Sequence, residues 1–129
     1  AFLAASDFVV NTLPLTSATR HLLGARELEA MQPHAFLVNV GHGFTVDTVA
    51  LVEALHKNKL GGAALDVCEP EPLPSAHSLW KFDNVLITPH YAGAHPGYHA
   101  RVTDIFVDNL GRYLAGEPLA HVVDFARGY

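Results

Sequence analysis

The chain has 129 residues, of which half are hydrophobic and 16 % are charged, a composition that fits one globular α/β domain and excludes a disordered protein. Its formal net charge is −5 and its eight Lys and Arg residues are scattered, which argues against nucleic acid and anionic membrane surfaces as partners. No apolar run approaches the ~20 residues of a membrane span, no basic segment marks a signal peptide, and the single cysteine, Cys68, fits a reducing compartment, so we expect a cytoplasmic protein.

Four short apolar runs, each ended by a turn signal, predict β-strands. The runs are continuous rather than alternating, which is typical of strands covered on both faces in a parallel sheet. Helical patterns fill the spaces between them, so right-handed crossovers are expected. The predicted strands are residues 8–13, 35–40, 62–67 and 84–89.

Two short helices are predicted between these strands. Residues 25–31 form the first, after a glycine. Asp47 stands where the N-cap of the second belongs, and the apolar residues Val49, Val52 and Leu55 then recur on one predicted face.

A longer helix is predicted after the fourth strand, with Pro96 in its first turn and Gly116 at its end. We assign residues 1–115 to the C-terminal half of a dinucleotide-binding domain that includes this helix, and residues 116–129 to a tail. The expected buried face of the helix consists of Val102, Ile105, Phe106, Leu110 and Tyr113.

The predicted fold class is therefore α/β: a partial Rossmann-like parallel sheet of about four strands with flanking helices. In such sheets ligands bind outside the carboxyl ends of the strands. Glycine or polar residues follow every predicted strand, and this coincidence indicates a binding site. These segments are residues 14–16, 41–43, 66–71 and 90–93.

Glu71 and His90 follow consecutive strands, and we expect them to be neighbours. A carboxylate beside an imidazole raises the pKa of the histidine toward or above neutrality, which suits a general acid. The alternative is a surface glutamate and a histidine that caps a strand. Asp66 lies at the end of an apolar strand, where a carboxylate needs a partner; that partner could be a ligand amide or nearby backbone N–H groups.

No metal site is expected. His95 and His99 are four residues apart, but Pro96 and Gly97 separate them, and neither cysteine nor carboxylate completes a ligand set. Cys68 is expected to pack as a small apolar residue, and Trp80 as a core or interface anchor. The remaining histidines are interpreted as solvated or packing residues: His21, His34, His56, His77 and His121.

Four segments in this order resemble the D-isomer-specific 2-hydroxyacid dehydrogenases: NTLPLTSATRHLLG, LVNVGHGFTVDTVALVEAL, GGAALDVCEPEPLP and NVLITPHYAG. The similarity runs from about residue 6 to the end. HSLW at residues 77–80 and the closing VDFARGY are most similar to the A-type glyoxylate/hydroxypyruvate reductases. The resemblance covers only the C-terminal part of such a protein.

The resemblance implies hydride transfer between NAD or NADP and a small 2-oxoacid, and the subgroup favours NADP. It makes His90 the proton donor to the substrate oxygen and Glu71 its hydrogen-bond partner, while Asp66 lies near the nicotinamide carboxamide. A homodimer is implied for a complete protein of this family. The residues that would line the cofactor are Leu13, Pro14, Val40, Gly41, His42, Ala92 and Gly93.

Two departures from the family pattern stand out. The family has an arginine between the two glycines of GHG, where it binds the substrate's carboxylate and carbonyl; here His42 occupies that position and cannot offer a guanidinium fork. The family's substrate domain and its G-x-G-x-x-G phosphate loop have no counterpart in this sequence. A smaller departure is His34, where the family has a glycine, and a positive φ there would strain the turn.

Three functional interpretations follow from these features. In the first, the chain is part of a glyoxylate/hydroxypyruvate-type oxidoreductase, and the isolated chain is inactive. The second is a truncated or degenerate relative that serves as a non-catalytic binding or oligomerisation module. The third is an unrelated flavodoxin-like or metal-binding α/β domain.

Overall fold

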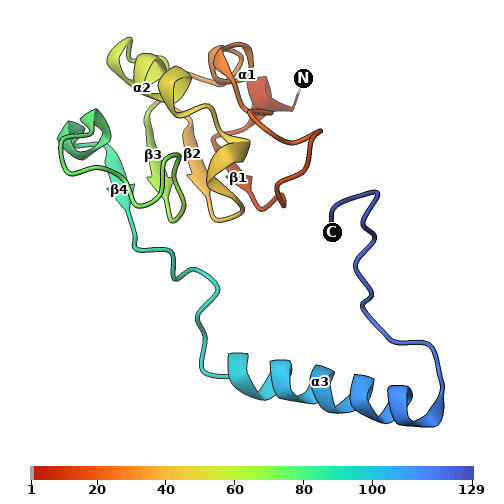
Figure 1. Ribbon diagram of the computed structural model, residues 1–129. Helices are drawn as coiled ribbons and strands as arrows, with labels where there is room; N and C mark the ends of the chain where they lie inside the picture. The colour runs from red at the N-terminus through yellow and green to blue at the C-terminus, as the bar shows by residue number, and fades with distance from the viewer. Residues whose placement is uncertain (1) are drawn as a thin grey trace. The chain divides into compact units, whose positions relative to one another are not determined.

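The computed structural model describes residues 2–129 and forms two compact units, Ala1–Tyr91 and Ala92–Tyr129. The first unit contains a parallel sheet in the strand order β1-β2-β3-β4, which is also the order along the chain. Each predicted strand is confirmed over a shorter range, and with them the α/β fold class (Figure 1). The strands are β1 (Phe8–Asn11), β2 (Phe36–Asn39), β3 (Gly62–Leu65) and β4 (Val85–Ile87).

One face of the sheet holds the core of this unit. Val9, Leu37 and Ala63 are neighbours in register across three strands and are at most 5 % exposed. On the opposite face Val10 and Leu86 are 57 % and 62 % exposed. The expectation that both faces are covered is therefore wrong within this unit, because both of its α-helices contribute to the same core.

Helices α1 (Ala25–Glu29) and α2 (Thr48–His56) supply Leu28, Leu51 and Leu55 to that core. As predicted, Asp47 caps α2: its carboxylate accepts the N–H groups of the second and third helical residues at 3.0 and 3.1 Å. Of the predicted apolar face, Leu55 lies in the core and Val52 packs against it, but Val49 is 78 % exposed. At 100° per residue it lies about 200° around the helix from Leu51, which is the residue that packs on the sheet.

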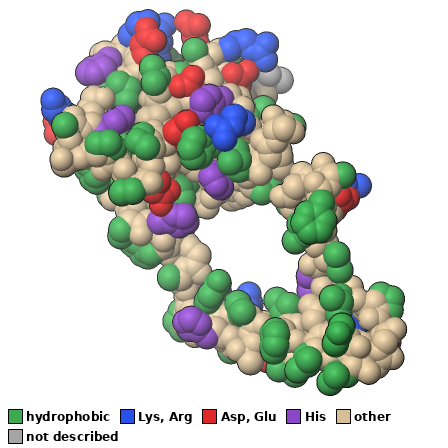
Figure 2. Space-filling view, viewed as in Figure 1, with side chains coloured by type: hydrophobic (Ala, Val, Ile, Leu, Met, Phe, Trp, Pro, Cys, Tyr) green, Lys and Arg blue, Asp and Glu red, His purple; other side chains and the backbone are tan. Residues whose placement is uncertain are grey.

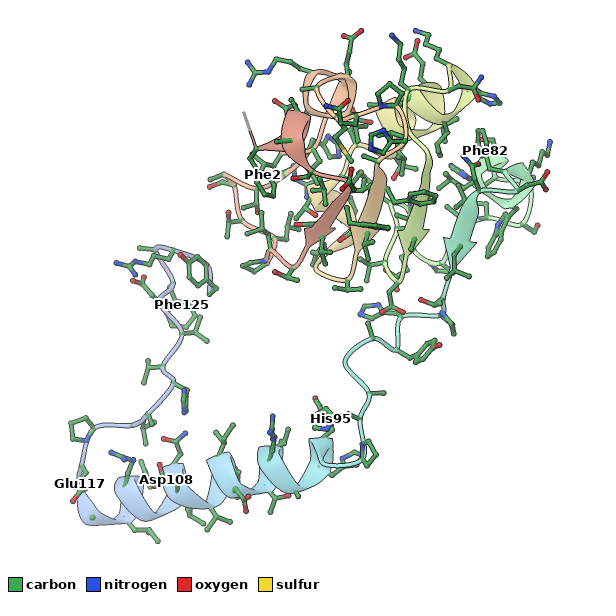
Figure 3. The ribbon with its side chains drawn as sticks, turned by 180° about the vertical axis from the view of Figure 1, so that it is seen from behind. Phe2, Phe82, His95, Asp108, Glu117 and Phe125 are labelled. Carbon is green, nitrogen blue, oxygen red and sulfur yellow. The ribbon has the colours of Figure 1, made fainter. Side chains whose placement is uncertain are left out.

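Short 3₁₀ helices complete the first unit: η1 (Leu3–Ala5), η2 (Gly43–Thr45) and η3 (Ser78–Lys81). Phe82, labelled in Figure 3, follows η3 and packs against the ring of His56 at the end of α2, with ring centroids 4.7 Å apart. Trp80 is 51 % exposed and is therefore not a core residue. Its indole N–H donates to the carbonyl of Pro74 at 3.0 Å, which satisfies the polar end of the ring.

Positive φ angles occur at four non-glycine residues of the described chain: His21, Asn58, His90 and His121. His34 is not among them, so the strain considered for that turn does not arise. Its imidazole instead contacts the carboxylate of Asp7 at 2.8 Å.

The second unit contains α3 (Tyr98–Ala115) and the segment that follows it. Gly116 ends the helix in the left-handed conformation, at φ 70°, as predicted. Pro96 does not lie in the first turn, because the N-cap is Gly97. The following segment is held to α3 by Asn109, whose side-chain amide exchanges two hydrogen bonds with the backbone of Ala120.

The predicted buried face of α3 is exposed in this unit. None of the described residues of α3 is buried. Hydrophobic side chains are visible along the surface of this helix (Figure 2). The five residues expected in the core are all between 44 % and 72 % exposed: Val102, Ile105, Phe106, Leu110 and Tyr113.

Candidate active site

The carboxyl ends of the four parallel strands lie at the same end of the sheet. The turns after these strands bring the predicted site residues of the first unit to that end. Residues 12–16 follow β1, 40–43 follow β2, 66–71 follow β3 and 88–91 follow β4. The N-terminal unit therefore contains every predicted site residue except Ala92 and Gly93. Those two lie in the second unit, and their cofactor contact stays a prediction.

The two glycines of GHG allow three turns to approach one another. A Cβ at Gly41 would stand 2.7 Å from the backbone N and O atoms of Leu13, in the turn after β1. A Cβ at Gly43 would overlap the backbone carbonyl of Cys68, in the loop after β3. Only glycine fits at either position without displacement of a backbone segment. His42, between them, is exposed.

A buried polar network, which sequence reasoning missed, supports this turn. The Asn11 amide donates to Asn39 Oδ1 at 2.8 Å and to Thr45 Oγ1 at 2.5 Å. The side chains of Asn39 and Thr45 both donate to the carbonyl of His42. Asn11 and Asn39 end β1 and β2 in the same register, and a polar residue at the same place in two apolar runs was the available signal.

The imidazole of His42 has a defined hydrogen-bonding role. Its Nδ1 accepts the backbone N–H of Phe44 at 3.4 Å, so in the neutral ring the proton resides on Nε2. Nε2 can therefore donate to a ligand oxygen. The Arg20 guanidinium stacks on the neighbouring Phe44 ring, 4.6 Å from its centroid, which places a cation beside the same turn.

His90 and Glu71 are in contact, as predicted. The distance between His90 Nδ1 and Glu71 Oε1 is 2.5 Å, which makes Nδ1–H the donor and the carboxylate the acceptor. The side chains are 65 % and 38 % exposed, so solvent and solutes reach the pair. The arrangement leaves Nε2 as the nitrogen that can exchange a proton with a substrate.

Asp66 fixes the turn that carries His90. Its carboxylate accepts the hydroxyl of Thr88 at 2.5 Å and the backbone N–H of Tyr91 at 3.0 Å. Its backbone carbonyl accepts the N–H of His90 at 3.1 Å. The sequence left either a ligand amide or a backbone N–H group as the partner of the Asp66 carboxylate, and the structure contains the backbone N–H of Tyr91. Since Asp66 is only 6 % exposed, these bonds are shielded and set the position of residues 88–91.

A pocket of about 280 Å³ adjoins the His90–Glu71 pair. Its lining is mainly apolar and combines the loop after β3 with the turn after β4. A mainly apolar pocket with a few convergent polar groups is the usual form of a small-molecule site. It is lined by Asp66, Cys68, Glu71, Pro72, Leu73, Trp80, Ile87, Thr88, Pro89 and His90.

Cys68 is buried in the wall of this pocket, as expected for a small apolar side chain. Burial, together with the nearby carboxylates of Glu71 and Asp66, raises the pKa of its thiol from 9.0 to about 11. The thiol therefore stays protonated at neutral pH and is a poor nucleophile. Among residues 2–129 no group of three His, Cys, Asp or Glu side chains is arranged to hold a metal ion.

We therefore expect Cys68 to resist alkylation in the folded chain. Near pH 8 the raised pKa leaves about 100-fold less thiolate than an ordinary thiol has, and burial slows access further. Iodoacetamide uptake followed by mass spectrometry measures this directly, because the chain contains one cysteine. The same chain unfolded in urea is the control. Equal rates in the two states would contradict the assignment.

The comparison with known protein families decides between the possible identities of this site. Residues 1–92, most of the chain, match the family described as D-isomer specific 2-hydroxyacid dehydrogenase, NAD binding domain. The chain belongs to this family. The predicted resemblance is thereby confirmed, and an unrelated flavodoxin-like or metal-binding domain is excluded.

Individual members of the D-2-hydroxyacid dehydrogenase family are similar over nearly the whole chain. A glyoxylate reductase of Thermofilum pendens is 46 % identical over 112 residues, which are 87 % of this chain and 33 % of that protein. A D-isomer specific 2-hydroxyacid dehydrogenase from Xanthobacter autotrophicus Py2, solved in complex with NADPH and MES, has a TM-score of 0.92 and 44 % identity, over 99 % of this chain and 52 % of that one.

A third relative is the NADPH-dependent glyoxylate/hydroxypyruvate reductase of Sinorhizobium meliloti, solved in complex with NADP and sulfate. Its TM-score is 0.88 at 34 % identity, over 99 % of this chain and 42 % of that one. The chain thus spans from a third to about half of the length of the relatives it matches.

The site residues fit the nicotinamide end of such a cofactor. Leu13 and Val40, at the carboxyl ends of β1 and β2, are 39 % and 40 % exposed and offer apolar contact to a flat ring, and Pro14 is exposed beside them. The sequence contains no G-x-G-x-x-G loop for the pyrophosphate.

Proposed function

We propose that this chain is the catalytic-histidine part of an oxidoreductase that reduces a small 2-oxoacid of the glyoxylate/hydroxypyruvate type. The observation that carries the proposal is the 2.5 Å contact between His90 and Glu71 beside a mainly apolar pocket at the carboxyl edge of the sheet. The family membership supports the same reaction. The complete enzyme is proposed to be a cytoplasmic homodimer; no helix among residues 2–129 is long and apolar enough to cross a membrane.

Each residue of the proposed site has a separate task. When bound, NAD(P)H supplies the hydride that reduces the carbonyl carbon. In its doubly protonated form His90 donates the Nε2 proton to the carbonyl oxygen as that oxygen gains negative charge, which leaves the neutral ring with Nδ1–H on Glu71. Hydride and proton together convert the ketone or aldehyde to the alcohol. Asp66 positions the turn of His90 through Tyr91 and Thr88.

His42 is proposed to bind the substrate carboxylate through Nε2–H. The nicotinamide end of the cofactor is assigned to Leu13, Pro14 and the backbone of residues 40–42, with Ala92 and Gly93 as further contacts. NADP is preferred over NAD, because two solved relatives are in complex with NADPH or NADP. The test is NADPH- and NADH-linked reduction of glyoxylate and hydroxypyruvate by the complete enzyme. If the complete enzyme reduced neither acid with NADPH or with NADH, the result would contradict the proposal.

Replacing His42 by arginine in the complete enzyme should raise kcat/KM for glyoxylate by about ten- to hundredfold. A guanidinium carries a permanent charge and two parallel donors, whereas imidazole offers a single donor, and one such donor is typically worth 10²–10³ in rate. Initial-rate kinetics measure the change. The matched control is His42→Lys, a point charge without a fork, which should gain less. An unchanged kcat/KM in H42R would contradict the expected gain and would show that His42 has taken over the role of the arginine or that the site is inactive.

A second candidate function is a non-catalytic binding or oligomerisation module. The observation that favours it is the exposed apolar surface of edge strand β1, where Phe8 and Val10 are 66 % and 57 % exposed. Light scattering of the purified chain tests this function. A monomer at all concentrations, with no protein recovered by pull-down, would contradict it.

A further inference from the structure

A second histidine–glutamate pair lies close to the first along the same loop. The distance between His21 Nε2 and Glu69 Oε2 is 2.5 Å, and the two residues are 48 positions apart in sequence. Only Pro70 separates Glu69 from Glu71. The side chain of Glu69 is 25 % exposed, less than the 38 % of the Glu71 side chain. The loop after β3 is therefore held at Glu69 by one histidine, immediately before it presents Glu71 to the other.

The backbone around His21 is attached to the GHG turn. His21 N–H donates to the carbonyl of Phe44 at 2.8 Å, and Leu23 N–H donates to that of Thr45 at 3.0 Å. His21 also has φ 50°, a conformation that side-chain-bearing residues rarely adopt and that persists where the surroundings impose it. His90, with φ 52°, shares this feature. Both histidines that pair with this loop thus have an imposed backbone conformation.

These contacts form a continuous path across the strand ends. The path starts at the turn that carries His42, passes through His21 to Glu69, and continues along the loop to Glu71 and His90. The other end of the loop is held at Pro74 by the Trp80 indole. Between these two attachments the carboxylate of Glu71 has to meet His90 Nδ1 at hydrogen-bonding distance, which requires the loop to keep one position.

We propose that His21 is a positioning residue, which acts through Glu69 to hold Glu71 against His90 and to couple that pair to the His42 turn. The proposal deepens the proposed function and rests on it for its catalytic consequence. Its structural consequence is independent of turnover: loss of the His21–Glu69 contact should release Glu71 and change the tautomer of His90. Glu71 enforces the Nδ1–H tautomer, whereas a free neutral imidazole favours Nε2–H.

The first experiment is ¹⁵N NMR of the His90 ring in the 129-residue chain. The Nδ1–H tautomer should dominate in the unmodified chain and lose population to Nε2–H in His21→Leu and in Glu69→Ala. His21→Gln keeps a donor near the Nε2 position and should restore the original spectrum. The matched control is His34→Leu, which removes another surface histidine–carboxylate contact, of 2.8 Å to Asp7, away from the loop. It should leave His90 unchanged.

The second experiment measures glyoxylate reduction by the complete enzyme. His21→Leu should lower kcat about ten- to hundredfold, the cost of a displaced catalytic group, with a much smaller change in KM. An unchanged His90 tautomer in folded His21→Leu would overturn the proposal. If that variant does not fold, Glu69→Ala decides the same question without altering the backbone at residue 21. An inactive unmodified enzyme would remove the proposed function but leave the NMR result decisive for the positioning role.

Discussion

Replacing His90 by glutamine in the complete enzyme should lower kcat for glyoxylate reduction by about 10²–10⁴-fold. A positioned acid typically contributes a factor of this size, and glutamine cannot transfer a proton at neutral pH. Its amide can still donate to Glu71, so the loop after β3 keeps its partner. KM should change little, because substrate binding is assigned to His42. Initial-rate measurement of NADPH oxidation over a range of glyoxylate concentrations gives both constants.

The control for this substitution is His99→Gln. His99 is exposed on α3 and has no place in the proposed site, so its replacement should leave kcat unchanged. If H90Q retained more than about a tenth of the original kcat, proton donation by His90 would be refuted. Water or another residue would then have to protonate the substrate.

Replacing Gly43 by alanine should lower the free energy of unfolding of the chain by about 3 kcal/mol or more, at the upper end of the cost of overpacking. The added Cβ would overlap the carbonyl carbon and oxygen of Cys68. Since the obstacle is backbone rather than a flexible side chain, either the GHG turn or the loop with Glu71 must move. Urea denaturation followed by circular dichroism measures the loss.

Gly24→Ala is the matched control in the same unit. Its Cβ would meet its nearest neighbours at 3.5 and 3.6 Å, which is ordinary van der Waals contact. The loss should be about 1 kcal/mol, the typical cost of placing alanine at an N-cap such as that of α1. Similar losses for G43A and G24A would show that the close approach of Gly43 to Cys68 does not limit stability.

The strands and the main site pair could be predicted because they depend on local pattern and chain order. Apolar runs that end at Asn11 and Asn39 form adjacent strands, and the parallel order brings the residues after β3 and β4 together. That order predicted Glu71 and His90 as neighbours, and their contact confirms the prediction.

The helix faces could not be predicted in the same way. The predicted face of α2 was right at Leu55 but wrong at Val49, which is exposed while Leu51 is buried. The apolar stripe of α3 was real but is exposed within its own unit. An amphipathic pattern predicts that one face of a helix favours burial. It does not predict which other helix or strand covers that face, because those elements lie elsewhere in the sequence.

The sequence by itself determined the family, the order of the strands and the identity of the chemical groups at the strand ends, because each of these is encoded in local residue patterns. Only the tertiary structure shows why glycines flank His42: backbone segments approach both positions closely. It also shows that Asn11 and Asn39 support the turn of His42 and that His21 contacts Glu69. These contacts join residues that are far apart in sequence, from Gly43 and Cys68 to His21 and Glu69, which are 48 positions apart. These contacts form only if backbone segments are spaced correctly to within a few tenths of an ångström, and that spacing is set by the packing of the folded chain.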